Sequence, residues 1–185
     1  RAELSKNTNL TILSGTTWSI DAAQGNRPFL SLSAGGHLQA STDELYNAMQ
    51  TKVAAGAFNE FSIEAWIKPT NTTQNGPARI LTLAWSAANV MLGQGGWTSI
   101  NPPTTVYDAR VRSDSVTNNG PDYRTPTGTA TTNLQHVVFT VSGDPVRGVI
   151  NKIYVDGAIQ LDDATDFYGN DTPFDFLKGW TPGYF

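Results

Sequence analysis

The sequence predicts an all-β protein folded as a single β-sandwich. Residues 61–68 alternate between apolar side chains and polar or amphipathic ones, which is the period of a strand with one face on a core. The apolar members are Phe61, Ile63, Ala65 and Ile67. Charged residues make up only 15% of the 185 residues, and 17 glycines and 10 prolines separate the apolar runs. Low charge with many turn formers is typical of antiparallel sandwiches, and this length suits one domain with a sizeable core.

The chain before this central strand is expected to form short strands and one helix. The predicted strands lie at 10–13, 18–20, 29–32 and 37–40. Gly35-Gly36 is expected to turn the last two of these into a hairpin. Residues 42–55 are the candidate helix, because Thr42 can cap its start, apolar residues recur at helical spacing, and Gly56 can end it.

Six apolar runs after the central strand predict the remaining strands. They lie at 79–85, 89–94, 106–112, 136–141, 152–155 and 158–161. The last two flank Asp156-Gly157, a dipeptide that strongly favours a two-residue hairpin turn. Residues 113–133 are dense in Asn, Gly, Pro and Thr. We expect them to form a long loop, a class of segment that often carries function.

Composition excludes several classes of site and partner. There is no cysteine, which rules out disulfides, thiolate metal sites and a cysteine nucleophile. The net charge of −4 and the scattered basic residues argue against a nucleic-acid partner. No apolar run approaches the roughly 20 residues of a membrane span, so we expect no membrane insertion. The first seven residues lack the apolar core of a signal peptide, so a secretion signal would have been removed or would lie outside this chain.

The succession of motifs along the chain is more specific than any one of them. In order they are F-S-I-E-A-W-I-K-P, R-I-L-T-L, V-M-L-G-Q, Y-D-A-R-V-R, L-Q-H-V-V-F-T-V and K-I-Y-V-D-G. This succession, over roughly Leu10 to Leu161, resembles the laminin-G-like domains of the concanavalin A-like lectin/glucanase superfamily. The resemblance implies a two-sheet antiparallel jelly-roll sandwich, here with one short helix. It also implies a non-catalytic, extracellular or cell-surface module that binds glycans or proteins.

Two elements of the family pattern are missing from the chain. Family members normally begin and end with a hydrophobic strand, and neither is found in residues 1–185, which we otherwise treat as one domain. A sandwich without these strands exposes unpaired backbone groups at a sheet edge. We therefore expect the gap to be closed by the chain's own ends, by a strand donated from another chain, or by residues of a longer polypeptide.

One stretch of the central strand is similar to the catalytic strand of the superfamily's glucanases. Those enzymes carry E-x-D-x-E, but Glu60-Phe-Ser-Ile-Glu64 has a serine at the central position. A retaining glycosidase needs two carboxyl groups about 5–5.5 Å apart, so the serine argues against glycoside hydrolase activity. The alternative is that Glu64 forms an ion pair with Lys68, or with Arg110 or Arg112 on a neighbouring strand.

An oxygen-rich segment near the C-terminus is a candidate calcium site. Its side chains are Asp162, Asp163, Asp166, Asn170, Asp171 and Asp175. Calcium takes six to eight oxygen ligands, and the family resemblance implies calcium at a sheet rim, although the spacing is not that of an EF-hand. The alternative is a solvated loop. The two histidines, His37 and His136, have no zinc-binding spacing and are expected to be structural.

Aromatic and polar side chains outside the predicted core are the candidate ligand-binding residues. They are Glu64, Trp66, Trp97, Asp108, Arg110, Arg112 and Tyr123. An exposed aromatic ring can stack on a sugar while neighbouring polar groups bind its hydroxyls. We therefore expect a non-catalytic extracellular binding or adhesion module for glycans or surface proteins. The alternatives are a structural subunit of a larger surface assembly and a degenerate glucanase.

Overall fold

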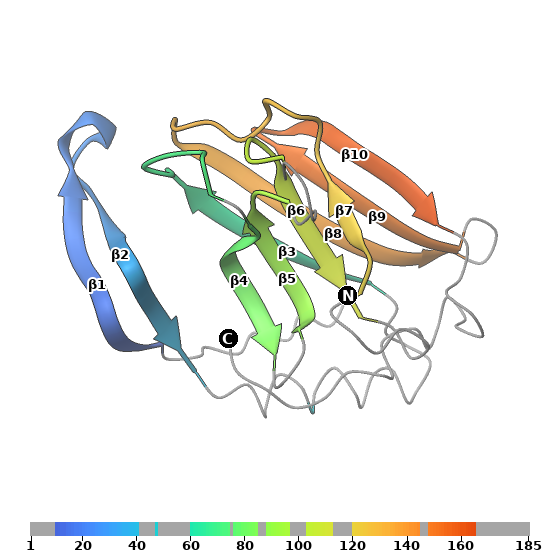
Figure 1. Ribbon diagram of the computed structural model, residues 1–185, viewed down its shortest axis with the longest axis horizontal. Coiled ribbons are helices and arrows are strands. Elements are labelled where there is room, and N and C mark those ends of the chain that lie inside the picture. Colours follow the sequence, from blue (N-terminus) through green and yellow to red (C-terminus); the bar gives the residue numbers. More distant parts are fainter. Residues whose placement is uncertain are drawn as a thin grey trace.

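The computed structural model describes residues 10–40, 47, 60–74, 76–84, 88–96, 103–112, 120–144 and 148–165. The described residues form ten β-strands and one short 3-10 helix, η1 (Figure 1). The elements are β1 Thr11–Asp21, η1 Ala22–Gln24, β2 Arg27–Gln39, β3 Glu60–Ile67, β4 Ala78–Ala84, β5 Ala88–Gln94, β6 Tyr107–Val111, β7 Asp122–Arg124, β8 Gln135–Asp144, β9 Gly148–Val155 and β10 Ala158–Thr165. The predicted all-β fold class is confirmed. The predicted helix 42–55 lies outside the described residues apart from Asn47, which is helical.

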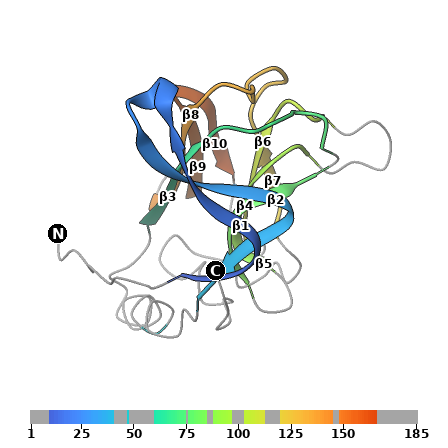
Figure 2. The same cartoon turned by 90° about the vertical axis from the view of Figure 1, so that its left-hand side faces the viewer.

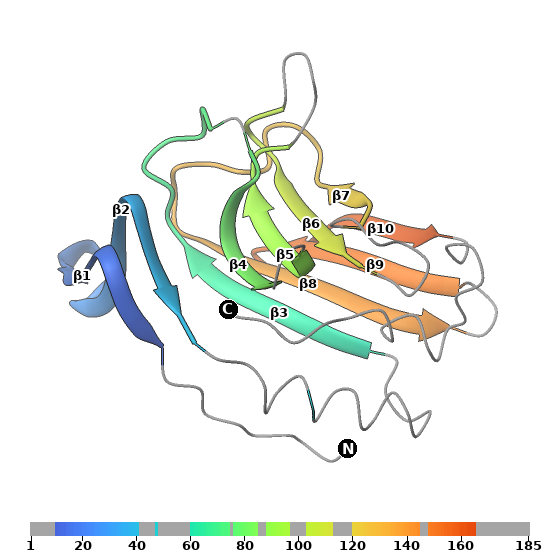
Figure 3. The same ribbon diagram turned by 60° about the horizontal axis from the view of Figure 1, so that its bottom comes forward.

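Two four-stranded antiparallel sheets make up the body of the molecule (Figures 1 and 3). One sheet has the order β4-β5-β6-β7, and the other has the order β10-β9-β8-β3. Most neighbours in the sheets are also neighbours in sequence. The exception is β3, which pairs with the distant β8 so that Trp66 lies opposite His136 and Ile63 lies opposite Phe139.

Apolar side chains from the inner faces of both sheets form one core. From β4 to β7 they are Leu83, Val90, Leu92, Tyr107, Ala109, Val111 and Tyr123; from β8 and β9 they are Val137, Phe139, Val141, Val149, Ile153 and Val155. Phe139 is fully buried. Its ring meets that of Phe61 edge-on at a centroid distance of 6.2 Å and stacks on Tyr123 of the other sheet at 6.5 Å. Phe139 therefore joins the two layers.

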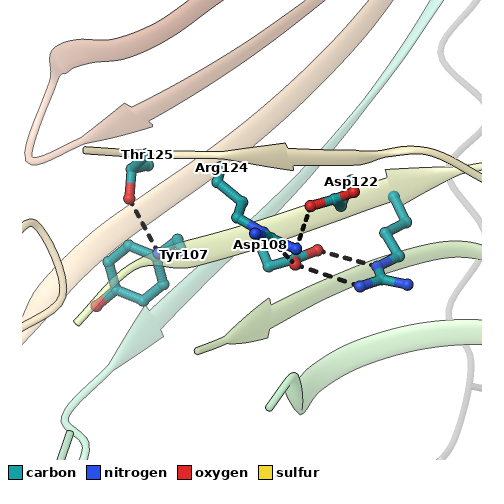
Figure 4. Close-up of polar contacts among 6 residues, drawn as sticks. Tyr107, Asp108, Asp122, Arg124 and Thr125 are labelled. Carbon is teal, nitrogen blue, oxygen red and sulfur yellow. Dashed lines mark hydrogen bonds and ion pairs between the residues drawn. The ribbon is translucent and has the colours of Figure 1, made fainter. Parts of the chain in front are cut away.

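A buried polar network ties the segment between β7 and β8 to this core. Gln135 Oε1 accepts hydrogen bonds from the Tyr107 hydroxyl at 2.9 Å and from the Thr131 backbone at 2.8 Å. Gln135 Nε2 donates to the carbonyl of Thr129 at 3.1 Å. The Tyr107 backbone N–H donates to Thr125 Oγ1 at 3.0 Å (Figure 4). Because these groups are satisfied, their burial fixes the segment without a large desolvation cost.

Tyr107 is expected to make the fold sensitive to high pH. Burial, with the negative charge of Asp156 adding to it, raises the pKa of Tyr107 from 10.0 to about 12. The folded state therefore holds this proton more tightly than the unfolded chain does. The resulting stability is fully present below pH 10 and is lost as the pH rises through about 12, with a total of about 3 kcal/mol.

The measurement is urea unfolding at several values between about pH 9 and pH 12. Wild-type protein should lose more unfolding free energy over this range than Tyr107→Phe, whose ring cannot ionise. The Phe variant also lacks the bond to Gln135, but that loss shifts its curve without changing its slope. Parallel curves for the two proteins would contradict the assignment.

Strands β1 and β2 form a separate two-stranded hairpin beside the sandwich (Figures 1 and 2). The prediction of four short strands in this region is wrong, because each pair of runs is one continuous strand. The turn lies at η1, where Asp21 accepts a hydrogen bond from the Ala23 backbone at 2.9 Å and Gly25 has φ +72°. An ion pair of 3.3 Å between Lys68 and Asp21 joins the hairpin to the end of β3.

The predicted turn at Gly35-Gly36 is instead an irregularity within β2. The register between β1 and β2 shifts near Ser14, opposite this dipeptide. A Cβ on Gly36 would lie 2.3 Å from the carbonyl oxygen of Gly15. Gly36 is thus needed because two backbones approach closely there, which is a role that sequence alone does not distinguish from a turn.

The predicted turn at Asp156-Gly157 is confirmed, whereas the predicted loop 113–133 is interrupted by a strand. The hairpin of β9 and β10 turns at Asp156 and Gly157, with φ values of +51° and +81°, as the dipeptide predicts. The expected loop 113–133 contains a strand, β7, whose three residues pair with β6. Residues 113–119 of that stretch lie outside the described part of the chain.

Candidate functional site

The outer face of the sheet β10-β9-β8-β3 carries an exposed tryptophan, Trp66. It is 68% exposed, although it lies in a strand that is paired along its whole length with β8. The alternation of β3 causes this, because Phe61, Ile63 and Ile67 point to the core and the residues between them point outward. Trp66 therefore presents its ring to solvent from a strand whose backbone is paired with β8.

One face of the Trp66 ring is covered by another side chain. Its ring stacks on the imidazole of His136, with a centroid distance of 4.5 Å and an interplanar angle of 15°. The imidazole is held in turn by Glu64, whose Oε2 lies 3.2 Å from His136 Nε2. The side chain of Glu64 is 71% exposed. The three residues therefore form a platform, hereafter the Trp66 platform, in which one tryptophan face and one carboxylate remain open.

The rest of this sheet face extends the Trp66 platform toward β10. The register places Glu64 opposite Val138, Val138 opposite Tyr154, and Tyr154 opposite Ile159. Tyr154 is half-buried, and Ile159 is 48% exposed. Side chains directly opposite each other share a face, so a row of apolar and aromatic groups crosses the sheet beside the carboxylate.

A second polar cluster lies on the outer face of the other sheet. Asp108 is fully buried and accepts hydrogen bonds from two arginines (Figure 4). Its carboxylate lies 3.1 Å from Arg110 Nε and 3.2 Å from Arg124 Nε. Arg124 also contacts Asp122. Because Asp108 pairs with Arg124 and Arg110 with Asp122 across β6 and β7, the four charges alternate in a square.

The electrostatics of this cluster suit a structural role. Burial raises the pKa of Asp108 above its ordinary value, while the hydrogen bonds from Arg110 and Arg124 and the charge of Arg110 act in the opposite direction. The arginine side chains are only 15% and 24% exposed. The guanidinium groups therefore interact mainly with the carboxylates, and these ion pairs stabilise the pairing of β7 with β6.

The partner of Glu64 in the structure differs from the ion-pair partners that the sequence suggested. Glu64 contacts His136, whereas Lys68 pairs with Asp21 and Arg110 pairs with Asp108. Arg110 and Arg112 belong to β6 and its end, in the opposite sheet, and Lys68 at the end of β3 turns to the β1–β2 hairpin. The prediction of a Glu64 pair with lysine or arginine was wrong.

The remaining predicted ligand-binding residues fall in different places. Tyr123 is a core residue, 3% exposed and packed on Phe139, so the prediction that it stacks on a ligand is wrong. Arg112 follows β6 and is half-buried. Trp97 lies outside the described residues. Among the predicted residues that the structure describes, only Glu64 and Trp66 come together on an open surface.

The described part of the acidic segment does not gather its carboxylates. Asp162 and Asp163 are consecutive in β10 and therefore point to opposite faces. Asp162 lies 3.3 Å from Lys152. Among the residues that the structure describes, no three His, Cys, Asp or Glu side chains form a group able to hold a metal ion. Asp166, Asn170, Asp171 and Asp175 lie outside these residues, so a calcium site there stays a prediction.

A family model described as the concanavalin A-like lectin/glucanases superfamily matches residues 42–181. The chain belongs to this superfamily. The match begins after the β1–β2 hairpin and includes the whole sandwich, from β3 to β10. No curated protein and no solved structure matches the chain.

Membership of the concanavalin A-like superfamily agrees with the two antiparallel sheets. Laminin-G-like domains within it are typically binding modules for glycans or proteins and are usually extracellular, although the superfamily also includes glycosidases. In the described part of the chain, no helix has the length and apolar character needed to cross a membrane.

His136 is the site residue that sequence reasoning missed. Its strand was predicted, but its imidazole was assigned a structural role because the neighbouring positions are apolar. The side chain is 25% exposed and holds both other members of the Trp66 platform. Pairing β3 with β8 in the correct register would have placed His136 opposite Trp66. The motifs themselves carry no signal for that register.

Proposed function

We propose that this domain is a non-catalytic, extracellular carbohydrate-binding module that holds a sugar ring against Trp66. The observation that carries the proposal is the exposed tryptophan held flat on His136, 4.5 Å away, with Glu64 beside it. A sugar presents one face of C–H groups, which packs on an aromatic ring, and a rim of hydroxyls, which bind carboxylates. The Trp66 platform offers both groups on one open face.

Preorganisation favours this platform as a binding site. The stack on His136 removes rotational freedom from Trp66 before a ligand arrives, so less entropy is lost on binding. Glu64 retains an exposed carboxylate that can accept hydrogen bonds from sugar hydroxyls. His136 acts here as a positioning residue, because Trp66 covers one face of its ring and Glu64 engages its Nε2.

The sequence of β3 argues against glycoside hydrolysis. Glu60 and Glu64 lie on the same face of the strand, at the spacing of the outer carboxylates in the E-x-D-x-E strand of the glucanases. The residue between them on that face is Ser62, where the glucanase strand has an aspartate, so the carboxylate set of those enzymes is incomplete here.

Trp66→Ala should abolish most of the sugar affinity. Loss of one stacked ring is expected to weaken binding by roughly 10-fold or more, because aromatic contacts contribute about 0.5–1.5 kcal/mol beyond their buried area. A glycan array of the wild-type domain identifies the ligand, and isothermal titration calorimetry of that ligand measures the variants. His136→Phe should retain much of the affinity because a stacked ring remains, whereas His136→Ala should not.

Trp18→Ala is the matched control for this experiment. Trp18 is 67% exposed, almost the same as Trp66, but lies on the hairpin. Its substitution should leave sugar affinity unchanged. Equal affinity of wild type and Trp66→Ala for the array ligand would contradict the proposal, as would sustained turnover of a β-glucan that disappears in Glu64→Gln.

A further inference from the structure

The ion pairs around the Trp66 platform leave the carboxylate of Glu64 available to a cation. Among the described residues, the side chain that contacts this carboxylate is the imidazole of His136, which is charged only when it is protonated. The nearby cations have other partners, because Lys68 and Lys152 each lie 3.3 Å from an aspartate. The exposed carboxylate therefore has no lysine or arginine beside it in the described part of the chain.

The wider charge of the protein has the same sign as this carboxylate. Glu60 is exposed on the same face of β3, two alternations before Glu64. The whole chain carries a formal net charge of −4. A field of one sign raises the local concentration of ligands of the opposite sign. A cationic ligand is therefore attracted to this face, whereas an anionic ligand would meet like charges.

The two open groups of the Trp66 platform suit a cation in different ways. The carboxylate of Glu64 only accepts hydrogen bonds, and an ammonium group offers three donors and no acceptor. The free face of Trp66 attracts a cation held within about 6 Å of the ring, and tryptophan is the best of the aromatic side chains for this contact. A neutral hydroxyl uses neither the charge of Glu64 nor the quadrupole of Trp66.

We propose that the sugar held on Trp66 is an amino sugar with a free, protonated amine. This inference rests on the proposed function, because it takes the stacking on Trp66 as given. Glu64 and Trp66 are two residues apart on one face of β3, about 7 Å along the strand. A sugar ring lying on the open face of the tryptophan can therefore direct an equatorial substituent toward the carboxylate. An equatorial ammonium group extends from the rim of the ring and leaves the C–H face free to stack.

The inference predicts an order of affinity among otherwise identical sugars. Acetylation of the amine removes its charge and adds a carbonyl acceptor, which has no favourable contact with a carboxylate. A hydroxyl at the same carbon is neutral and donates one hydrogen bond. The free amine should bind roughly 5- to 30-fold more tightly than either neutral form, as expected for one exposed ion pair combined with one cation–π contact.

Isothermal titration calorimetry on the full chain tests this order with three β-1,4-linked oligosaccharides of equal length. They carry a free amine, an acetamide or a hydroxyl at carbon 2 and are otherwise alike. The pH is set below the pKa of the free amine, which is found by titrating that oligosaccharide alone. The preference of wild-type protein for the amine should shrink as the salt concentration rises, because salt screens exposed charges. This salt series needs no variant.

Glu64→Gln tests whether the preference comes from this carboxylate. Glutamine keeps the shape of the side chain and removes its charge, so the ratio of the amine affinity to the hydroxyl affinity should fall toward 1. Glu60→Gln is the matched control, because it removes the same charge from the same face of β3 at a greater distance from Trp66. Its ratio should stay close to that of wild type.

The outcomes separate this inference from the proposed function. Neutral sugars that bind through Trp66 with no preference for the amine would overturn the inference and leave the proposed function intact. A preference that survives in Glu64→Gln, or that Glu60→Gln reduces equally, would also overturn it. Free choline, a permanent cation without a sugar ring, should bind weakly, and an affinity equal to that of the amino oligosaccharide would overturn the assignment to a sugar. No binding of any sugar at Trp66 would overturn both.

Discussion

Phe139→Ala is expected to lower the free energy of unfolding by about 3–5 kcal/mol. Phe139 is fully buried, and its ring contacts Phe61 in its own sheet and Tyr123 in the other. Truncation removes the apolar transfer free energy of the ring and leaves a cavity between two sheets that cannot close independently of each other. A loss of this size is a large part of the stability of a domain, which is about 5–15 kcal/mol.

The neighbouring residue provides the control for this prediction. Val138 is adjacent in β8 but points to the outer face and is half-buried. Val138→Ala should therefore cost much less, on the order of 1 kcal/mol. Urea denaturation followed by tryptophan fluorescence measures both variants. Similar losses for the two would show that the layers are not joined through Phe139.

Asp108→Ala is expected to cost about 3–5 kcal/mol as well, for an electrostatic reason. The carboxylate is fully buried and accepts hydrogen bonds from Arg110 and Arg124. Its removal leaves two guanidinium groups, 15% and 24% exposed, without the acceptor that they share. Breaking a buried pair by removing one partner is costly because the remaining charge keeps its desolvation penalty.

The pH dependence of Asp108→Asn separates charge from shape. Asn keeps the volume of Asp and one oxygen acceptor, so it should cost much less than Ala at neutral pH. Burial raises the pKa of Asp108 above 3.8, so the folded state binds this proton more tightly than the unfolded chain. The contribution of Asp108 to the free energy of unfolding is therefore greatest below about pH 4 and declines as the pH rises through the pKa of Asp108 in the folded state. Asp108→Asn should lack this decline.

The exposed ion pair of Asp162 with Lys152 is the control for the buried cluster. The Asp162 side chain is 42% exposed, and such pairs contribute about 0–1 kcal/mol. Asp162→Ala should therefore change stability little. An Asp108→Ala variant as stable as Asp162→Ala would mean that the two arginines find other acceptors.

The strands of the sandwich were predictable because their side chains alternate or form β-branched runs. The strands β3, β8, β9 and β10 lie where these patterns place them, and the Asp156-Gly157 turn follows from backbone preferences alone. Such signals are local. The prediction fails at Gly35-Gly36, because a glycine in a turn and a glycine at a close approach of two strands look alike in sequence.

The candidate site was only partly predictable because it depends on pairing between distant strands. Trp66 and Glu64 could be assigned to the outer face of β3 from the alternation. Their contact with His136 depends on the register of β3 against β8, which no local motif specifies. For the same reason Tyr123 was misassigned, since whether a residue in a loop-like stretch is buried depends on the sheet above it.

The pairing of β3 with β8 has a consequence for how the chain folds as it is synthesised. The runs β4 to β7 and β8 to β10 are each local meanders that can form soon after they leave the ribosome. Strand β3 ends at Ile67, but its only strand partner among the described residues begins at Gln135. At about 5–20 residues per second, β3 waits several seconds for β8 to be made.

During that interval the apolar residues of β3 are exposed while the chain is still attached. Glu60 and Glu64 on the opposite side of the strand then act against aggregation, as charges beside an apolar run commonly do. The carboxylate of Glu64 thus opposes aggregation of the nascent strand, and in the folded domain it holds His136 beside Trp66. The earliest strand of the sandwich to be synthesised is among the last to find its place.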